Sequence, residues 1–248
     1  MNPSPFRTPI GLDQHSLMFG TTGSGKSFRT SIQVRGRIQL LMAHQIPPRS
    51  YKIIILDSKQ VGWGGDNHLG NFVSLVKTVN GVLVWDWRDI KWNDDHYLYV
   101  WRMEDGAINP ENINSFFMEA RLHKLRSPQG ESTAFPFWII LDELVDISTT
   151  ETSRVIYLSG LTKLLSEGRS AGQTVCIETQ TPSYIHGDIK RMTTVRFVFR
   201  LPDPTDREYV AKLLGSPILK RRIPDAFGFY YQNDMIAGGE IFYYDGVK

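Results

Sequence analysis

The chain has 248 residues, which suits one large α/β domain, and its 41% hydrophobic and 22% charged content is that of an ordinary globular protein. A single cysteine, Cys176, excludes an internal disulfide and a cysteine-rich metal site. The formal net charge of +2 excludes nothing, because a protein that binds nucleic acid can gather its positive charge in one region while the whole chain stays near neutral.

Residues 1–15 are expected to form an irregular arm, since Pro3, Pro5 and Pro9 each remove a backbone donor. They lack the apolar stretch of a secretory signal, and no apolar run in the chain approaches the ~20 residues that span a bilayer. We therefore expect a cytoplasmic protein without a transmembrane segment, in which residues 16–248 form a single domain.

The first half of that domain alternates strands and helices. A short apolar strand at 17–19 runs into a glycine-rich loop, and a helix over 27–43 is stopped by Pro47-Pro48. Residues 52–57 form a continuous apolar strand, as expected for a parallel sheet covered on both faces. Two further strands are predicted at 82–85 and 97–101.

The second half continues the alternation. A helix begins at Asn109-Pro110, and a polar loop is expected over 126–135 before the strongest predicted strand, at 137–141. A helix over 153–168, strands at 174–177 and 196–199, and a short helix from Asp203-Pro204 follow. Residues 227–231 and 241–244 predict a hairpin around Gly238-Gly239. The alternation predicts one doubly wound, mostly parallel sheet with a C-terminal β-hairpin.

A complete phosphate-binding motif, G-x-x-x-x-G-K-[ST], lies between the first strand and the first helix. Its residues are Gly20, Thr21, Thr22, Gly23, Ser24, Gly25, Lys26 and Ser27. Glycines let backbone N–H groups turn inward around phosphate oxygens, and the following helix directs its positive end at them. Lys26 is expected to reach the β- and γ-phosphates of ATP, and the Ser27 hydroxyl to ligate Mg²⁺. The alternative, a glycine-rich turn that matches by chance, is disfavoured by this strand–loop–helix context.

Two acidic residues follow the strand at 137–141, at the edge where ligands bind in open α/β sheets. Asp142 is expected to hold Mg²⁺ through water, and Glu143 to act as general base for an attacking water. The alternative is a solvated acidic pair after a core strand. Gln180, at the end of the strand over 174–177, is a weaker candidate for orienting that water.

The triplet Leu158-Ser159-Gly160 is similar to the signature of ABC transporter ATPases. In those proteins the signature precedes the acidic strand, whereas here it follows Asp142. We therefore interpret the triplet as part of a packed helix.

Taken in order, these segments resemble the FtsK motor domain. GTTGSGKS, IIILDSKQV and WIILDELVDI resemble the family's phosphate loop, its strand ending in Asp-Pro-Lys and its acidic strand, and the segment LTKLLSEGRSAGQTVCIETQTPS is similar to the one that carries Arg-Ala-Ala-Gly and Ala-Thr-Gln-Arg-Pro-Ser. Ser58 stands in place of the family's proline and Thr181 in place of its arginine. The resemblance runs from about Ser16 to Gly215.

The resemblance to the FtsK/HerA translocases implies a RecA-like P-loop NTPase core, a homo-hexameric ring and ATP-driven movement along double-stranded DNA. It implies that Gln180 senses the γ-phosphate and that Arg169 reaches the ATP of the neighbouring subunit. A solvated cation at a helix end is the alternative for Arg169, and Arg196 and Arg200 are rivals for the role.

The length favours a viral genome-packaging ATPase, with a capsid or membrane portal component as a further candidate partner and a packaging vertex of the virion as a further location. A conjugation or plasmid-transfer motor, a secretion or assembly ATPase that moves protein, and a nucleotide-gated scaffold are the alternatives. For DNA contacts the sequence offers only candidates. These are the loops 59–71 and 126–135 and the basic clusters Lys220-Arg221-Arg222, Arg121-Lys124-Arg126 and Lys190-Arg191.

Overall fold

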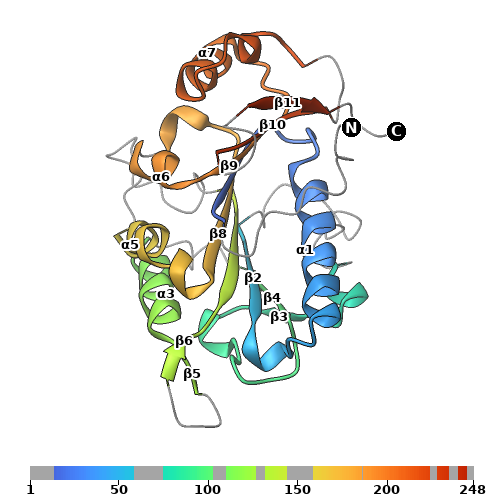
Figure 1. Cartoon of the computed structure of the whole chain (residues 1–248), viewed down its shortest axis with the longest axis vertical. Coiled ribbons are helices and arrows are strands. Elements are labelled where there is room, and N and C mark those ends of the chain that lie inside the picture. The colour runs from blue at the N-terminus through green and yellow to red at the C-terminus, as the bar shows by residue number, and fades with distance from the viewer. Residues whose placement is uncertain are drawn as a thin grey trace.

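The computed structural model describes residues 14–58, 75–102, 110–126, 132–143, 159–185, 187–223, 228–234 and 240–244. Nine of the described strands form one sheet in the order β11-β10-β9-β1-β8-β7-β2-β4-β3 (Figure 1). Its strands are β1 (Ser16–Phe19), β2 (Lys52–Asp57), β3 (Val82–Val84), β4 (Leu98–Arg102), β7 (Phe137–Asp142), β8 (Gln173–Thr179), β9 (Val195–Val198), β10 (Phe229–Asn233) and β11 (Ile241–Tyr244).

The seven strands from β9 to β3 are mutually parallel, whereas β10 and β11 pair antiparallel. The predicted doubly wound, mostly parallel sheet with a C-terminal hairpin is therefore confirmed, although the predicted turn, Gly238-Gly239, lies outside the described residues. The α-helices are α1 (Lys26–Ala43), α3 (Pro110–Leu122), α5 (Ser159–Glu167), α6 (Gly187–Met192) and α7 (Pro204–Leu213). The short 3₁₀ turns are η1 (Pro48–Ser50), η2 (Trp87–Asp89), η3 (Arg169–Ala171), η4 (Pro182–Tyr184) and η5 (Pro217–Lys220).

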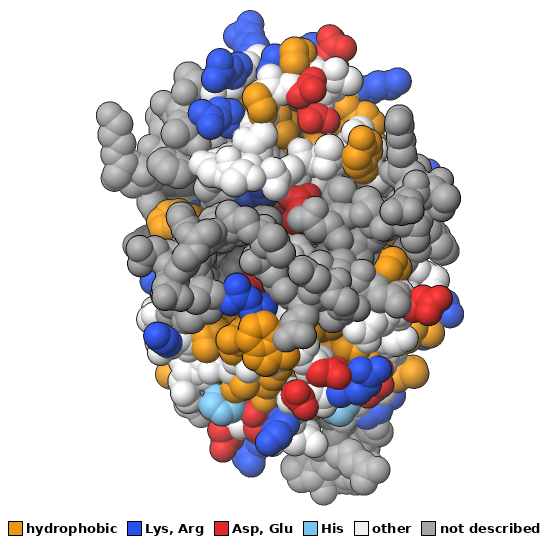
Figure 2. All heavy atoms as spheres, turned by 180° about the vertical axis from the view of Figure 1, so that it is seen from behind, with side chains coloured by type: hydrophobic (Ala, Val, Ile, Leu, Met, Phe, Trp, Pro, Cys, Tyr) orange, Lys and Arg blue, Asp and Glu red, His pale blue; other side chains and the backbone are white. Residues whose placement is uncertain are grey.

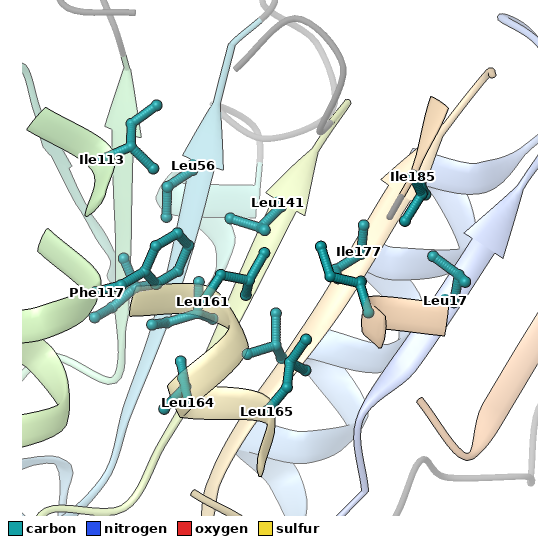
Figure 3. Close-up of a cluster of buried hydrophobic side chains, with 14 of the residues drawn as sticks. Leu17, Leu56, Ile113, Phe117, Leu141, Leu161, Leu164, Leu165, Ile177 and Ile185 are labelled. Carbon is teal, nitrogen blue, oxygen red and sulfur yellow. The ribbon is translucent and has the colours of Figure 1, made fainter. Parts of the chain in front are cut away.

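Helices cover both faces of the sheet because its strands alternate their apolar side chains between two cores. Met18 points into a cluster with Val34 and Ile38 of α1. Leu17 and Phe19 point into the other cluster, which α3 and α5 complete. Figure 3 shows Leu17, Leu56, Leu141 and Ile177 on neighbouring strands, facing Phe117 of α3 and Leu161, Leu164 and Leu165 of α5.

The structure corrects several predicted boundaries. The expected polar loop over 126–135 holds a small antiparallel hairpin, in which β5 (Lys124–Arg126) pairs with β6 (Ser132–Ala134). The sequences of β5 and β6 lack the alternation of apolar and polar residues that would have predicted strands here. The strand predicted at 174–177 extends to Thr179, and α6 was not predicted. Much of the helix predicted over 153–168 precedes Ser159 and lies outside the described residues.

Ser159 and Gly160 lie at the contact between α5 and α3. The Gly160 N–H donates to Asn114 Oδ1 at 2.7 Å, and a Cβ on Gly160 would lie 2.9 Å from Phe117 Cβ. A side chain at this position would therefore push the two helices apart. The interpretation of the triplet 158–160 as a packing element is confirmed for these two residues.

Residues Gln14 and His15, assigned to the predicted arm, are buried against the sheet. The His15 carbonyl accepts from the backbone N–H groups of Thr194 and Val195, and its Nδ1 accepts from Val175 N at 3.1 Å. Burial, and then the positive charge of Arg169, lowers the pKa of His15 to about 4. The remainder of the arm lies outside the described residues.

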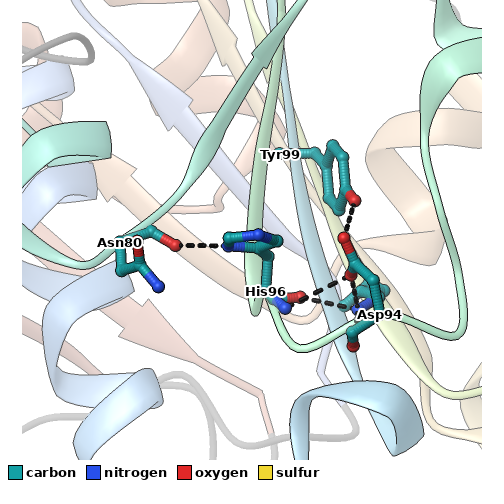
Figure 4. A network of polar contacts seen from close by, with 5 residues as sticks. Asn80, Asp94, His96 and Tyr99 are labelled. Carbon is teal, nitrogen blue, oxygen red and sulfur yellow. Dashed lines mark hydrogen bonds and ion pairs between the residues drawn. The ribbon is translucent and has the colours of Figure 1, made fainter.

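A polar clamp joins the amino ends of β2 and β4, at the edge of the sheet away from the phosphate loop (Figure 4). Lys52 Nζ donates to Asp94 Oδ1 at 2.7 Å and to the His96 carbonyl at 2.6 Å, and Tyr99 OH donates to Asp94 Oδ2. The His96 ring bonds the Asn80 carbonyl at 2.9 Å.

No helix among the described residues is both long and apolar enough to cross a membrane.

Candidate nucleotide-binding and hydrolysis site

The phosphate loop leaves β1 at Gly20 and enters α1 at Lys26. Gly23 (φ 73°) and Gly25 (φ 98°) take left-handed backbone conformations that favour glycine. Gly20 is required by close approach, since a Cβ there would lie 2.6 Å from Phe199 Cβ. The loop is fixed between two strand ends, because Gly20 N donates to the Thr179 carbonyl and Thr21 N to the Arg200 carbonyl, both at 3.1 Å.

Lys26 and the first turn of α1 offer the loop's positive charge. The Lys26 side chain is almost fully buried, and its ammonium donates to the carbonyls of Gly20 and Thr21. Gly25, at the N-cap, has no side chain to bond the first N–H groups of this 18-residue helix, and its first turn holds no acidic residue. Backbone donors and an ammonium therefore converge where an anion would be stabilised.

A buried carboxylate that sequence reasoning did not select lies behind Ser27. Glu178, on β8, is fully buried, and its Oε2 accepts from the Ser27 hydroxyl at 3.4 Å. Its Oε1 accepts from the Thr30 hydroxyl, one turn further along α1. The available signal was an acid interrupting the apolar run of this strand. A Ser27 hydroxyl that donates to Glu178 keeps its lone pairs for another partner.

Asp142 and Glu143 lie at the carboxyl end of β7, as predicted, and both are buried. The Asp142 carbonyl accepts from the Ser58 hydroxyl at 2.6 Å, so the serine that replaces the family's proline supports the acidic strand. Glu143 has φ 63°, an uncommon conformation for a residue with a side chain. Its Oε1 accepts from Thr179 Oγ1 at 3.1 Å and from Gln180 N at 3.0 Å.

Gln180 connects this carboxylate to the phosphate loop. Its side-chain oxygen accepts from Thr22 Oγ1 at 2.8 Å and from Thr22 N at 3.3 Å. The strand order explains the contact, because β8 lies between β1, which leads into the loop, and β7, which delivers Glu143. The structure thus brings together Thr22, Gln180 and Glu143, three residues that are far apart in the sequence.

No protein-family model matches the chain, but curated proteins and solved structures do. The chain is 24% identical over 227 residues to a DNA translocase FtsK of Helicobacter pylori, a match that covers 88% of this chain and 24% of the relative. It is 28% identical over 211 residues to FtsK of Caldanaerobacter subterraneus, covering 82% of this chain and 26% of that protein. The chain is related to the FtsK DNA translocases. It spans about a quarter of their length.

Solved structures share the fold. The genome packaging NTPase B204 from Sulfolobus turreted icosahedral virus 2, in complex with ATP-gammaS, has a TM-score of 0.65 at 17% identity, with 96% of this chain and 100% of that chain covered. EccC of Thermomonospora curvata, ATPases 2 and 3 in complex with a signal sequence peptide, has a TM-score of 0.55 at 16% identity, covering 95% of this chain and 37% of that chain. The predicted resemblance and α/β fold class are both confirmed.

In this FtsK-like fold Arg169 lies in η3, immediately before β8. The phosphate loop lies beyond the other end of that strand, whose seven residues span about 20 Å at ~3.3 Å each. Arg169 lines an open cavity of about 600 Å³ together with Ser166, Glu167 and Ser170. Arg169 is therefore remote from the phosphate loop of its own chain.

The two rival arginines have other surroundings. Arg196 Nη1 donates to Asp234 Oδ2 at 2.7 Å and to Gln232 Oε1 at 3.0 Å, so it is paired within its own subunit. Arg200 lies beside its own phosphate loop, since its carbonyl accepts from Thr21.

The three basic clusters also differ in structure. Arg121 pairs with Glu167, and Lys190 is buried against the Tyr209 hydroxyl and ring. By contrast, Lys220, Arg221 and Arg222 are all exposed. Of the predicted DNA-contacting loops, 59–71 lies outside the described residues, and 126–135 is described in part.

Proposed function

We propose that this chain is the ATP-hydrolysing motor domain of a double-stranded DNA translocase, and that it packages a viral genome into a capsid. The observation that carries the proposal is the bridge from Thr22 through Gln180 to Glu143, which links a complete phosphate loop to a base for water. Similarity to the FtsK DNA translocases supports DNA as the polymer that is moved. The full-length match of B204 to this chain supports packaging.

In this proposal each residue of the site has one task. Lys26 and the N–H groups of the loop bind the β- and γ-phosphates of ATP. The Ser27 hydroxyl and the Asp142 carboxylate are oxygen ligands of the kind Mg²⁺ prefers, and they would hold it directly and through water, respectively. Bound there, Mg²⁺ would neutralise charge on the phosphates. Glu143 accepts the proton of the attacking water.

Gln180 would couple the binding of the γ-phosphate to the position of the general base, Glu143. Its side chain would exchange the bond to Thr22 for one to the phosphate. Because its backbone N–H holds Glu143 Oε1, that movement would change how the carboxylate is held. Coupling of this kind would let Glu143 act when ATP is bound. Arg169 would complete the site of the next subunit in a homo-hexameric ring.

Glu143→Gln tests the hydrolytic assignment, because the amide keeps the shape of the side chain but cannot accept the proton. We expect nucleotide binding within about threefold of the unaltered protein and hydrolysis reduced by at least ~10²-fold. Glu119→Gln, the same chemical change at an exposed position of α3, is the matched control and should have no effect. Near-normal hydrolysis by Glu143→Gln would exclude Glu143 as the base.

A protein-moving secretion ATPase is the second candidate, favoured by the similarity to EccC. A conjugation motor is a third and shares DNA with the first. Hydrolysis stimulated by duplex DNA of any sequence, and not by peptides, supports a DNA translocase. Stimulation by peptide alone would favour secretion. In the first case a capsid or portal component is the proposed further partner, at a packaging vertex.

A further inference from the structure

The carboxyl-terminal end of α7 and the turn η5 that follows it carry four exposed cations. We call Lys212, Lys220, Arg221 and Arg222 the cationic tip. In the part of the chain that the structure describes, none of these side chains makes a hydrogen bond or ion pair. Helix α7 lies at one end of the long axis of the molecule, and Figure 2 shows Lys and Arg side chains gathered at this end.

Acidic and basic side chains lie at opposite ends of α7 and the turn that follows it. Its acidic residues, Asp203, Asp206 and Glu208, lie at the N-cap and in the first turns of α7, where the helix dipole favours negative charge. The cationic tip lies at the opposite end. Residues 203–223 hold five Lys and Arg against three Asp and Glu, a surplus equal to the net charge of the whole chain. An anionic partner would therefore be attracted to this end of α7.

The cationic tip is held by a hydrogen-bonded connection to the phosphate loop. Arg207 Nε donates to the Lys220 carbonyl at 3.1 Å, and its Nη1 donates to the Leu201 carbonyl at 2.9 Å. Leu201 directly follows Arg200, whose carbonyl accepts from both the N–H and the hydroxyl of Thr21. A shift of the loop would thus be passed to the tip through a short, bonded stretch of backbone.

A second attachment joins α7 to the segment that follows Gln180. The ammonium of the buried Lys190, on α6, donates to the Tyr209 hydroxyl and lies 4.2 Å from the centre of its ring. Helix α6 comes shortly after η4, which itself begins two residues after Gln180. Two segments that contact the phosphate loop therefore connect to α7. The segment after Arg200, which bonds Thr21, connects through Arg207, and the segment after Gln180, which bonds Thr22, connects through Lys190.

We propose that the cationic tip binds the phosphate backbone of duplex DNA and that Arg207 positions it relative to the nucleotide loop. This inference rests on the proposed DNA-translocating function. Exposed lysines and arginines without internal partners suit contacts that ignore base sequence, as a motor that must pass any sequence requires. The bonded connection through Arg207 explains how DNA at the tip and nucleotide at Thr21 would influence each other.

The test compares two triple variants that remove the same charge. Lys220→Gln/Arg221→Gln/Arg222→Gln removes three tip cations. Arg35→Gln/Arg49→Gln/Lys77→Gln removes three exposed cations of α1, η1 and the residues before β3. Binding of a fluorescent duplex is measured from 50 to 300 mM salt, with hydrolysis measured with and without DNA. We expect the tip variant alone to lose about tenfold or more in affinity and to flatten the slope of log K against log salt by ~2–3.

Both triple variants should keep the thermal unfolding midpoint of the unaltered protein, which shows that they fold. Equal binding and equal salt slopes in the two triple variants would overturn the inference and leave the proposed function intact. An unaltered protein that neither binds duplex DNA nor is stimulated by it would overturn the proposed function, and the inference with it.

Arg207→Gln tests the positioning role, because it keeps all four tip cations. We expect DNA affinity to stay within about threefold while DNA stimulation of hydrolysis falls several-fold, a split that simple loss of charge would not produce. Arg207→Lys should recover little, since one ammonium cannot reproduce the planar fork of the guanidinium. Full stimulation in Arg207→Gln would overturn this part of the proposal.

Discussion

At the scale of single residues, Glu178 is a buried side chain of β8 that contacts a residue of the phosphate loop. The resembled family has alanine before Thr-Gln, whereas this chain has a buried carboxylate that receives the hydroxyls of Ser27 and Thr30. Burying a carboxylate is costly unless its oxygens are bonded, and here both oxygens accept from α1. Glu178 therefore joins β8 to the first turns of α1 and orients the hydroxyl proposed to ligate Mg²⁺.

We predict that Glu178→Gln raises the Mg²⁺ concentration needed for half-maximal hydrolysis about tenfold, since residues that orient a metal ligand affect metal affinity to this extent. Nucleotide binding in EDTA should change little. Thr30→Val removes the other hydroxyl donor but leaves Ser27 in place, so its Mg²⁺ requirement should stay close to normal. An unaltered Mg²⁺ titration in Glu178→Gln would show that the carboxylate has only a packing role.

At the scale of elements, the clamp between Lys52 and Asp94 fixes the amino ends of β2 and β4. Burial lowers the pKa of Lys52, and the bond to Asp94 opposes that shift. For Asp94, burial alone would raise the pKa, but hydrogen bonds from Lys52, Tyr99 and the His96 backbone lower it overall. A carboxylate with a lowered pKa stabilises the fold above its unfolded pKa, and this stabilisation is lost as the pH falls through the folded value.

We therefore predict that Asp94→Asn lowers the free energy of unfolding by about 2–4 kcal/mol at pH 7, because it leaves the Lys52 ammonium buried beside a neutral group. The difference from the unaltered protein should shrink as the pH falls below the unfolded carboxyl pKa of ~3.9 and through the lowered pKa of folded Asp94. Denaturant unfolding at pH 7 and pH 3 measures both values. The neighbouring exposed Asp95→Asn is the control and should cost less than ~0.5 kcal/mol. A difference that persists unchanged at pH 3 would contradict the charge-based explanation.

At the scale of the whole molecule, the placement of Arg169 predicts a site shared between subunits. A cation beside the transferred phosphoryl group is worth ~10³–10⁵ in rate, so Arg169→Ala and Lys26→Ala should each be inactive alone. When the two variants are mixed, about one quarter of the interfaces in a head-to-tail ring pair an intact loop with an intact arginine. Part of the activity should therefore return on mixing.

The control for this experiment mixes Lys26→Ala with Asp142→Asn, two changes in the same site, which cannot restore each other if Arg169 acts in trans. Fluorescence transfer between labelled subunits must first show that subunits exchange. Exchange without recovery in the Arg169 mixture would place Arg169 in its own subunit's chemistry or show that one inactive site stops the ring. A fully active Arg169→Ala would exclude the role and direct attention to Arg200.

The sequence by itself determined the features that neighbouring residues encode. The phosphate loop is contiguous from Gly20 to Ser27, and Asp142-Glu143 directly follows five apolar residues, so both were predicted with their secondary structure. The parallel strands were also predictable from the sequence, because burial on both faces requires continuous apolar runs. The polar hairpin of β5 and β6 and the short helix α6 lack such patterns and were missed.

Only the tertiary structure decided which of these features meet. Placing β8 between β1 and β7 depends on long-range strand pairing, and this order sets Gln180 between Thr22 and Glu143. The same pairing places Glu178 against α1. The sequence also could not show which basic clusters are paired and which are exposed. A lysine that bonds a distant tyrosine and one that faces solvent look alike in a sequence. Contacts between residues far apart in the chain follow from how the whole sheet packs, which no local pattern records.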